Sequence, residues 1–327
     1  MLKECLDSVF LTNYPRYDVI VIDNGSIDTS CAVIERDFPN VKLIKLRENL
    51  GFSKGNNLGI LHSKADFVVL LNNDTLVSPS WLSELMQEAK KNHDCFYQPK
   101  ILLSENKRIN SAGNYIQLLG FAFPRGLDKP DIGQYEGVHE VSYASGACVL
   151  ASKDFIQKIG LLDEDDLFSY YEDVNWGWRA LMLGYSSIYV SSSVIYHKWG
   201  GSYGNTLSEK KFFLIERARL ATLYRNYDAK TLACLFPALL AVEMIMLLFS
   251  FKKGFASKKI RAYSDLIKAK KVLSYQKRQL LKNRKRSDKA ILNHFTNGFF
   301  HPYLGTLSNP INKCLVFVGR YLRAFVR

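Results

Sequence analysis

The feature of this sequence that most constrains its fold is the run DFVVLLNND (66–74), in which an almost entirely apolar stretch ends in three polar residues. An apolar run of this length is typical of a strand that is buried on both faces. Two more strand-like runs, YDVIVIDNGS (17–26) and VKLIKLREN (41–49), precede it, and helix-like segments separate the three. This alternation predicts an α/β fold, with a mostly parallel, Rossmann-like sheet and helices on both faces.

The carboxyl ends of these predicted strands carry polar side chains. In open α/β sheets, ligands bind beyond such ends. Polar residues stand at three of them: Asp23-Asn24, Asn49 and Asn72-Asn73-Asp74. Asp74 is the best single candidate for a metal ligand, because Mg²⁺ and Mn²⁺ prefer oxygen ligands. Its position alone is equally consistent with capping the turn that follows.

The segment YYEDVNWGWRALMLG (170–184) begins with two adjacent acids, Glu172 and Asp173, and continues with apolar residues at helical spacing. Two explanations stay open for the acids. They can interact favourably with the helix dipole, or one of them can accept a proton from a substrate hydroxyl. His197 ends a later strand-like run, and a lone histidine is more often structural than a ligand.

The charge of the chain is unevenly distributed. Residues 1–202 hold 19 Lys and Arg against 25 Asp and Glu, whereas residues 203–327 hold 25 against 6, a net charge of −6 followed by one of +19. An acidic, soluble-type domain is thus joined to a basic region that we expect to face an anionic partner. No recognition motif accompanies the basic charge, so nucleic acid is not the expected partner.

The basic region begins with an apolar run, TLACLFPALLAVEMIMLLFSF (231–251), which is interrupted by Pro237 and Glu243. Its length suffices to cross a bilayer, but the central glutamate favours a tilted, re-entrant or interfacial helix at least as much. Residues 252–289 then carry 15 Lys and Arg, the pattern of a segment beside an anionic cytoplasmic leaflet. The alternative is a core helix followed by a solvated charged helix.

The six cysteines are scattered without a CxxC pair. This spacing predicts a reducing compartment and no structural zinc site. The first residues, MLKECLDSVF, lack the pattern of a signal peptide.

Taken in order, several strings resemble motifs of family 2 glycosyltransferases of the GT-A fold, especially the rhamnosyltransferase-like branch. They are VIDNGSIDTS, NLGFSKGNNLGI, LLNNDT, SAG, PRG, SGACVLASKDF, GLLDEDDLFSYYEDVNWGWRALMLGY and HKWGGS. The resemblance extends over residues 1–225 and implies a glycosyltransferase domain there. Residues 226–327 would form a helical, membrane-associated region.

The resemblance also implies roles for individual residues. Asp173 would be the catalytic base, with Glu172 as its partner, and Asp74 and His197 would bind a divalent cation, Mg²⁺ or Mn²⁺. Tyr171 and Trp176 would contact the acceptor. The donor nucleotide-sugar would be bound by Asp23, Asn24, Asn49, Gly51, Phe52, Gly55, Asn56, Asn72, Arg125 and Gly146.

The implied reaction is an inverting transfer of a sugar, rhamnose-like or another hexose, from a nucleotide-diphosphate donor. The acceptor would be a lipid-linked or growing glycan in the synthesis of surface polysaccharide or glycoconjugate. The protein would act at the cytoplasmic face of the cell membrane, bound peripherally or through one hydrophobic segment.

The sequence departs from the family pattern at three places. Family members open with a strand before the helix that begins here at MLKECLDSVF, so this chain is expected to lack that strand. Asn72 replaces the first acid of the metal motif, and Asn175 replaces an acid that often follows the Glu-Asp pair. A non-catalytic membrane-bound scaffold derived from the family is therefore an alternative. A nucleotidyltransferase is a weaker one, because its Gly-rich, Lys-containing loop is not visible.

Overall fold

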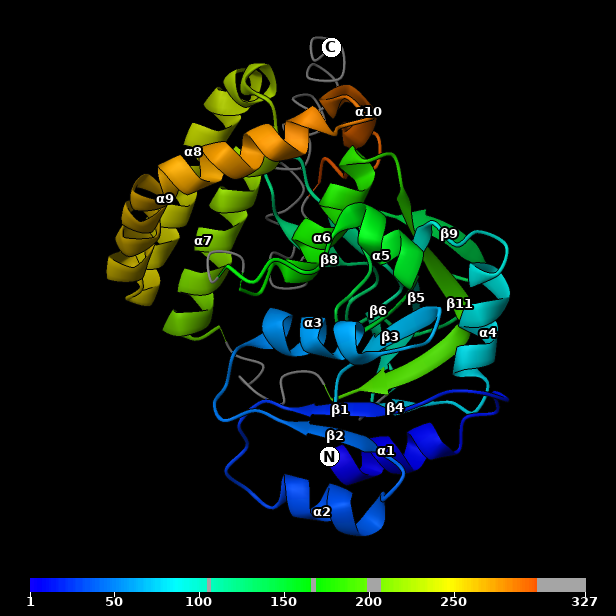
Figure 1. Cartoon of the computed structure of the whole chain (residues 1–327). Coiled ribbons are helices and arrows are strands. Elements are labelled where there is room, and N and C mark those ends of the chain that lie inside the picture. Colours follow the sequence, from blue (N-terminus) through cyan, green and yellow to red (C-terminus); the bar gives the residue numbers. More distant parts are fainter. Residues whose placement is uncertain (105–106, 166–168, 199–206, 299–327) are drawn as a thin grey trace.

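The structure is a computed structural model that describes residues 1–104, 107–165, 169–198 and 207–298. Its first part alternates helices and strands, as the sequence predicts (Figure 1). The elements run in the order α1 (Leu2–Phe10), β1 (Ile20–Asp23), α2 (Ser30–Asp37), β2 (Lys42–Lys45), α3 (Phe52–His62), β3 (Phe67–Leu71), β4 (Thr75–Val77) and α4 (Trp81–Ala89).

Shorter strands follow before the alternation resumes. The elements are β5 (Cys95–Leu103), β6 (Ile109–Ser111), β7 (Asn114–Ile116), β8 (Ala122–Pro124), β9 (Val138–Val141), β10 (Cys148–Ser152), α5 (Lys153–Ile159), α6 (Glu172–Met182) and β11 (Ser186–His197). Local sequence signals set the bounds of α5. The Ser152 hydroxyl accepts the Phe155 N–H at 3.1 Å and caps its start. Gly160, with a φ of +83°, ends it.

The large sheet is mixed rather than mostly parallel. Its strand order is β3-β10-β5-β11-β4, with β6 beside β5 and β9 beside β11. β11 runs parallel to β5, whereas β10 runs antiparallel to both of its neighbours. β4 and β9 also pair antiparallel with β11, and β6 pairs antiparallel with β5, so β5–β11 is the parallel pair of this sheet among the described residues. β1 and β2 form a separate parallel pair.

Helices cover both faces of the large sheet, as predicted. On one face, α1 and α4 pack against β5, β10 and β11 through a cluster that includes Cys5, Leu85, Ile101 and Val190. On the other face, α3, α5 and α6 contribute Ile60, Phe155, Trp176 and Ala180 to a second cluster, which surrounds Phe96 of β5. The side chains at the carboxyl ends of the strands thus lie between two packed layers of helices.

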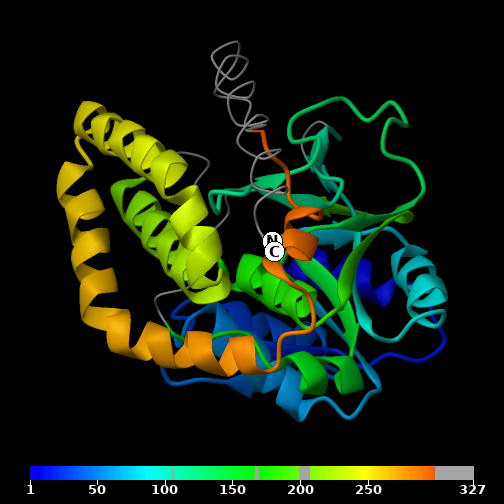
Figure 2. The same ribbon diagram turned by 90° about the horizontal axis from the view of Figure 1, so that it is seen from above.

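The C-terminal region is helical, with α7 (Glu209–Asn226), α8 (Ala229–Lys253), α9 (Ala256–Lys282) and α10 (Asp288–Leu292). The three long helices lie to one side of the sheet (Figure 1, Figure 2). α8 begins at an Asp228 cap and ends at Gly254, which adopts the left-handed conformation. Of the described part of the chain, α8 is the one helix that is long and apolar enough to cross a membrane.

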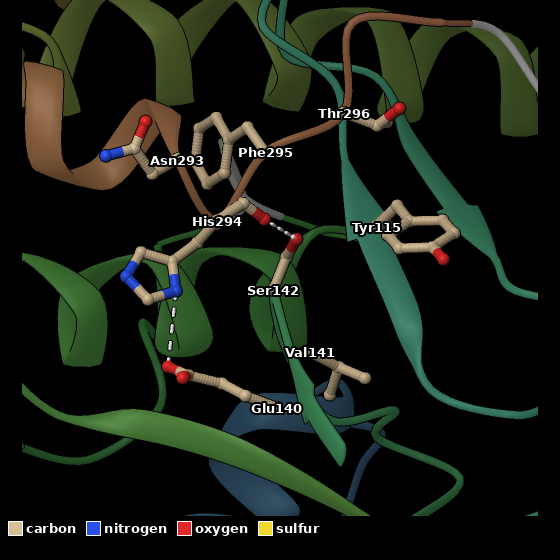
Figure 3. A pocket seen from close by; sticks show the side chains of 8 residues that line it. All are labelled: Tyr115, Glu140, Val141, Ser142, Asn293, His294, Phe295 and Thr296. Atoms are coloured by element: carbon tan, nitrogen blue, oxygen red, sulfur yellow. Dashed lines mark hydrogen bonds and ion pairs between the residues drawn. The ribbon is translucent and has the colours of Figure 1, made fainter.

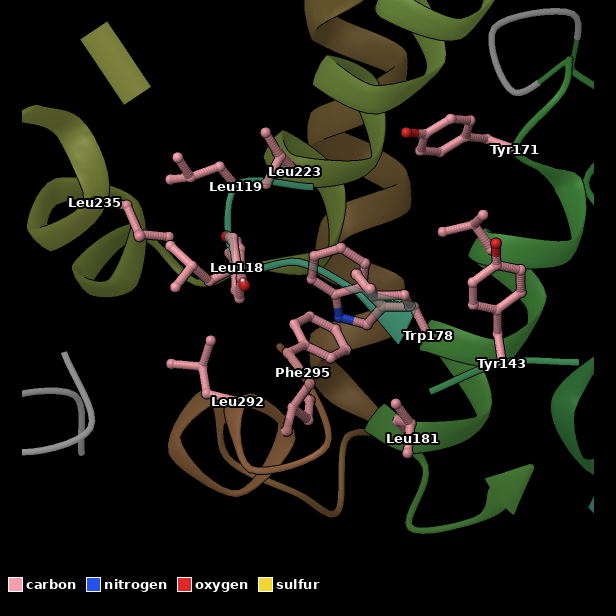
Figure 4. Close-up of a cluster of buried hydrophobic side chains, with 14 of the residues drawn as sticks. Leu118, Leu119, Tyr143, Tyr171, Trp178, Leu181, Leu223, Leu235, Leu292 and Phe295 are labelled. Atoms are coloured by element: carbon pink, nitrogen blue, oxygen red, sulfur yellow. Dashed lines mark hydrogen bonds between the residues drawn. The ribbon is translucent and has the colours of Figure 1, made fainter. Parts of the chain in front are cut away.

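One core cluster joins the helical region to the rest of the molecule. Trp178 of α6 packs edge-on against Tyr227, which follows α7, and against Phe295, at 4.9 and 4.7 Å between ring centroids. Leu235 of α8 belongs to the same cluster (Figure 4). The segment after α10 also pairs with the β7 region, where the Thr296 N–H donates to the Ile116 carbonyl at 2.9 Å. The hydrophobic core therefore extends across the predicted boundary at residue 225.

Candidate active site

Asp74 and His197 meet at the edge where β3 and β11 end. Thr75, the first residue of β4, pairs with His197, the last residue of β11, and this register places the histidine Nε2 3.2 Å from Asp74 Oδ1. Both side chains are largely buried. The structure therefore brings together two predicted metal ligands that are far apart in the sequence.

Asn110 is the hydrogen-bond partner of the other ring nitrogen of His197. Nδ1 lies 3.1 Å from Oδ1 of Asn110, an atom that only accepts hydrogen bonds. The tautomer that carries its proton on Nδ1 satisfies this contact and turns the Nε2 lone pair toward Asp74. Asp74 Oδ1 is buried and accepts no hydrogen bond from the described residues. Two electron-rich atoms that face each other in this way fit a cation, for which imidazole nitrogen and carboxylate oxygen are suitable ligands.

No group of three or more His, Cys, Asp and Glu side chains that would hold a metal by itself occurs in the described ranges. A cation at Asp74 and His197 would thus take its remaining ligands from water or from a bound diphosphate. The donor set of one carboxylate and one imidazole fits such a shared site.

The segment after β1 and the loop before α3 are held together by an asparagine. Asn24 accepts the Leu50 N–H at 2.7 Å and donates to the Gly51 carbonyl at 3.0 Å. Gly25 beside it has a φ of +76°, and a Cβ there would lie 2.7 Å from the Glu48 backbone, so only glycine fits this approach. The predicted donor residues of these two segments are therefore adjacent.

Three predicted donor residues form hydrogen bonds within these segments. Asn49 accepts the Gly51 N–H at 2.9 Å, and Asn56 donates to the Phe52 carbonyl at 2.9 Å. Asp23 accepts the Ser26 N–H at 3.2 Å. Burial raises the pKa of Asp23, but hydrogen bonds from Ser26 and Cys31 outweigh it and hold the pKa below its ordinary value. Asp23 is therefore anionic at neutral pH.

The loop before β10 connects the donor side to the acids of α6. Asp173 Oδ2 accepts the Gly146 N–H at 3.0 Å. A Cβ on Gly146 would lie 3.3 Å from the Phe52 ring and 3.6 Å from the Asp173 Cβ, so these three residues are in close contact. The same loop is tied to the end of β3, where the Asn72 N–H donates to the Ala147 carbonyl at 2.9 Å.

The two acids at the start of α6 are both harder to ionise than ordinary carboxyl groups. Burial, and then the neighbouring Asp173 charge, raise the pKa of Glu172 to about 7. Burial also raises the pKa of Asp173, although the N–H groups of Gly146 and Val174 stabilise its ionised form. A carboxylate whose pKa is raised toward the working pH is better suited to general-base catalysis than an ordinary one.

The two predicted acceptor residues have a different placement from the one expected. Trp176 is 3% exposed, its Nε1 donates to the Gly160 carbonyl at 2.8 Å, and its ring packs on Phe96. Tyr171 is 4% exposed, and its hydroxyl donates to the Gly120 carbonyl at 3.2 Å. Neither ring presents a face to an acceptor sugar, because α6 is buried on all sides rather than amphipathic.

Two further positions named from the motifs have partners inside the fold. Arg125 donates to the Ala112 carbonyl at 2.6 Å, and its guanidinium lies about 5 Å from the rings of both Tyr135 and Tyr189. This cation–π arrangement already uses much of the guanidinium surface. Asn175 is fully buried and faces Asn226 of α7, so it is directed away from the acceptor side.

Sequence reasoning missed several buried polar residues that position the site. Gln98 of β5 accepts the Ser145 N–H at 2.7 Å and donates to Ser111 at 2.9 Å, so it holds the loop that carries Gly146. The side-chain amide of Asn57 in α3 donates to the Leu162 carbonyl at 3.0 Å and accepts a hydrogen bond from the Leu162 N–H at 3.1 Å. A glutamine inside the apolar run CFYQPKILL was a usable signal, because a buried amide needs partners.

A cavity of about 430 Å³ lies elsewhere, between the end of β9 and the segment after α10 (Figure 3). Glu140 and His294 form an ion pair on its wall at 3.2 Å, and Ser142 donates to the His294 carbonyl at 2.5 Å. None of the predicted site residues lines this cavity. Its chemistry is separate from that of Asp74 and Asp173.

Comparison with known proteins gives a family match over residues 1–160, to the model described as glycosyl transferase family 2. The N-acetylglucosaminyl-diphospho-decaprenol L-rhamnosyltransferase of Mycobacterium tuberculosis is 29% identical over 222 residues, which cover 60% of this chain and 72% of the relative. The chain spans only 24% and 14% of the lengths of two relatives from Sinorhizobium fredii and Myxococcus xanthus.

Solved structures agree with this match at the level of the fold. GalNAc-T7 with UDP, GalNAc and Mn²⁺ superposes with a TM-score of 0.54 at 15% identity, over 68% of this chain and 45% of that one. Residues 1–349 of Staphylococcus aureus TarS superpose with a TM-score of 0.51 at 15% identity, over 99% and 86%. The GT-A fold is thereby confirmed. Residues 1–160 of this chain are thus assigned to the domain of glycosyl transferase family 2.

Proposed function

We propose that the protein is an inverting, metal-dependent glycosyltransferase that moves a hexose from a nucleotide-diphosphate sugar to a glycan or lipid-linked acceptor. The observation that carries this proposal is the pairing of Asp74 with His197 at 3.2 Å, beside the loop that holds Asp173. Family membership supports sugar transfer, and the Mycobacterium tuberculosis relative is named for a lipid-linked acceptor.

Asp173 is the proposed general base. Its carboxylate accepts the proton of the acceptor hydroxyl while that oxygen attacks the anomeric carbon of the donor sugar. The bond from this carbon to the diphosphate breaks in the same step, and the nucleoside diphosphate leaves with the bonding electrons. A single displacement inverts the configuration at the anomeric carbon. The Gly146 N–H holds Oδ2, which orients the carboxylate beside the donor side of the site.

Asp74 and His197 would hold a divalent cation, Mg²⁺ or Mn²⁺. When bound, the cation neutralises charge on the leaving diphosphate. Asn24, Gly51, Phe52 and Asn72 are the proposed donor residues, joined to the base through the 145–147 loop. Glu172 is the proposed partner that orients the base and adjusts its ionisation.

The helical region has features that would suit a membrane location and a lipid-linked acceptor. α8 has the length and composition to associate with a bilayer, and residues 203–327 carry a net charge of +19. Basic segments next to an apolar helix favour the cytoplasmic leaflet. We therefore propose the cytoplasmic face of the cell membrane as the place of the reaction.

The test is a panel of nucleotide-diphosphate sugars incubated with the purified full chain and Mn²⁺, with release of nucleoside diphosphate as the readout. Turnover should disappear in Asp74→Ala. Asp173→Asn should keep donor binding and lose transfer, because only the proton acceptor is removed. Asp154→Asn, an exposed acid in the first turn of α5, is the matched control and should behave as the wild type.

A non-catalytic scaffold is the second candidate. It is favoured by the separation of the β1–β2 pair from the large sheet, since a divided sheet can hold its carboxyl-end residues less firmly. If the folded wild type binds no nucleotide-diphosphate sugar with either Mg²⁺ or Mn²⁺, the enzymatic proposal is rejected and the scaffold is retained.

A further inference from the structure

The glutamate in the middle of the apolar helix α8 is held by an ion cluster inside the helical region. Glu243 Oε2 accepts the Lys259 ammonium at 2.7 Å and the Tyr263 hydroxyl at 2.7 Å, both from α9. Its other oxygen is paired with Arg219 of α7. Glu216 of α7 is bonded to Arg219 at 2.9 Å and also contacts Lys259, so two acids and two bases balance each other.

Other contacts show that α8 lies against α7 along its length. Phe249 near the end of α8 packs on Phe212 near the start of α7, at 6.2 Å between ring centroids. Leu235 near the start of α8 shares a core cluster with Leu223 near the end of α7. With Glu243 and Arg219 paired between them, the two helices are antiparallel neighbours.

α9 runs alongside α7 in the opposite sense to α8. Asp265 pairs with Arg217 at 3.6 Å, and about two turns further along both helices Ser274 is bonded to Tyr224 at 2.8 Å. α9 contains nine Lys and Arg residues. If α8 crossed a bilayer in this arrangement, α7 and α9 would enter the hydrocarbon beside it, with a large cost for each unpaired charge.

The face of α8 that points away from α7 is apolar over its whole length. Phe236 is 61% exposed and Leu248 is 66% exposed, and Leu240, Met244 and Phe251 lie on the same face at helical spacing. The one charged residue of α8 between Phe236 and Phe251 is Glu243, and its carboxylate is paired with Arg219 and Lys259 inside the helical region. An apolar stripe of this length is rare on a surface that faces only water.

The exposed charge on α8 and α9 has one sign. The two acids of α8 and α9, Glu243 and Asp265, are both paired with cations inside the helical region. The exposed charged residues of the two helices are all basic: Lys230, Lys252, Lys253, Arg261, Lys268, Lys270, Lys271, Arg278 and Lys282. Such a surface complements an anionic lipid bilayer in both charge and polarity.

We propose that α8 docks in the plane of an anionic bilayer, with Phe236, Leu240, Met244 and Leu248 inserted at the headgroup boundary, and that it does not cross the membrane. The Glu243 cluster keeps α8 attached to α7 and α9 while its outer face meets the lipid. This inference deepens the membrane location proposed above, but it does not depend on the catalytic assignment.

Insertion depth distinguishes an in-plane helix from a spanning one. A spin label is attached to a cysteine introduced in turn at Phe236, Met244 and Phe251, in the full chain with Cys31, Cys234 and Cys314 replaced by serine. Accessibility to oxygen and to a water-soluble nickel complex is then measured on vesicles that contain phosphatidylglycerol. The three labels should report one shared, shallow depth. A depth that changes progressively from Phe236 to Phe251 overturns the proposal, because it is the signature of a spanning helix.

Binding itself is tested by sedimentation with the same vesicles. The double variant Leu240→Glu, Leu248→Glu should bind about tenfold more weakly or worse, because two exposed apolar side chains that insert into the bilayer are lost. The matched control, Leu61→Glu with Ile132→Glu, removes two equally exposed apolar residues outside the helical region and should bind as the wild type. Binding should also weaken with added salt and with phosphatidylcholine alone.

Three outcomes would overturn the proposal. The first is that the wild type does not sediment with anionic vesicles, and the second is that the two double variants bind alike. The third is that a second copy of the chain covers the α8 stripe in a stable dimer. Donor binding by each variant, measured without vesicles, reports on the proposed function separately. If the wild type binds no donor, the glycosyltransferase proposal is rejected and the docking result is unaffected.

Discussion

Among single residues, Glu172 gives a prediction about pH. Its pKa is 4.5 in an ordinary environment and about 7 in the fold, so folding favours the neutral acid. The stability associated with this preference is fully present below pH 4.5 and is lost as the pH rises through about 7. Glu172→Gln should therefore raise the free energy of unfolding by about 2–3 kcal/mol above neutral pH, and by nothing in acid.

Urea unfolding of both proteins across the pH range measures this difference. Glu209→Gln, in the exposed first turn of α7, is the control and should show no such pH dependence. A Glu172→Gln effect that is the same in acid and in base would show that Glu172 ionises normally.

Asn110 gives a second prediction at this scale, because it is the hydrogen-bond partner of Nδ1 of His197. Asn110→Ala removes the acceptor for Nδ1 at 3.1 Å, so the ring loses its fixed tautomer and orientation. Mn²⁺ affinity in the presence of a nucleoside diphosphate should fall by about 10- to 100-fold, the usual effect of losing such a partner. Calorimetric titration checks it, with the exposed Asn73→Ala as control. Unchanged affinity would show that Asn110 does not support a metal site at His197.

The motifs named Asp74 and His197 together, and these two side chains lie 3.2 Å apart, but the motifs did not predict the surroundings of α6. The sequence pattern suggested one apolar face, with Trp176 available to a sugar. In the structure every residue from Val174 to Met182 is buried, because the sheet and α7 enclose the helix from both sides. Such two-sided burial depends on segments distant in sequence, so periodicity alone does not reveal it.

At the scale of elements, the turn after β1 allows a steric prediction. Gly25→Ala would place a Cβ 2.7 Å from the Glu48 backbone, whereas a Cβ at Gly51 meets nothing within 4 Å. Both glycines have positive φ, so both variants carry backbone strain, and the contact with the Glu48 backbone comes in addition at Gly25. Gly25→Ala should therefore cost about 1–3 kcal/mol more in unfolding free energy than Gly51→Ala. Equal losses, measured by urea unfolding, would contradict the close approach.

The Glu243 cluster supplies a second prediction for the elements. Glu243→Leu leaves Arg219 and Lys259 with one acid fewer in a buried position, and should cost about 3–5 kcal/mol. Adding Lys259→Met should recover a large part of this loss, since the remaining Glu216–Arg219 pair is balanced. Thermal unfolding of the single and double variants measures the recovery. A double variant as unstable as the single one would show that charge balance is not what stabilises this layer.

The strands of the first part follow from hydrophobic runs and turn residues, and those elements agree with the prediction. The position of β10 between β3 and β5 was not predicted, and neither was the mixed character of the sheet. Its sequence, CVLAS, is short and contains no alternation. Its position is decided by pairing with two strands far away in the sequence, which a single-segment pattern cannot encode.

For the whole molecule, the shared core predicts one cooperative unit. Phe295 lies beyond α10, yet its ring packs on Trp178 of α6 at 4.7 Å. Phe295→Ala should cost about 3–5 kcal/mol, as expected for a large ring removed from a packed core, and the loss should affect helices and sheet together. Calorimetry and far-ultraviolet dichroism check this. Two separate transitions, with only the later one shifted, would contradict a single unit.

The charge and hydropathy of the chain predicted two regions of different character, and this distinction holds in the placement of α7, α8 and α9 beside the sheet. The boundary was less well predicted. The core that contains Leu118, Trp178 and Leu235 joins both regions, because each one alone would leave part of this cluster in water. Composition shows that the charge and hydropathy of the two regions differ, but it does not show which of their surfaces pack against each other.

This continuity has a practical consequence for preparing the protein. Cutting the chain at residue 225 to remove the apolar helix would also remove Leu235, Leu292 and Phe295, and would expose the face of α6 that they cover. The shortened product should aggregate rather than become easier to handle. Replacing the outward residues of α8 with polar ones leaves the inward packing complete. A water-soluble version for crystallisation is therefore better obtained by these substitutions than by cutting the chain.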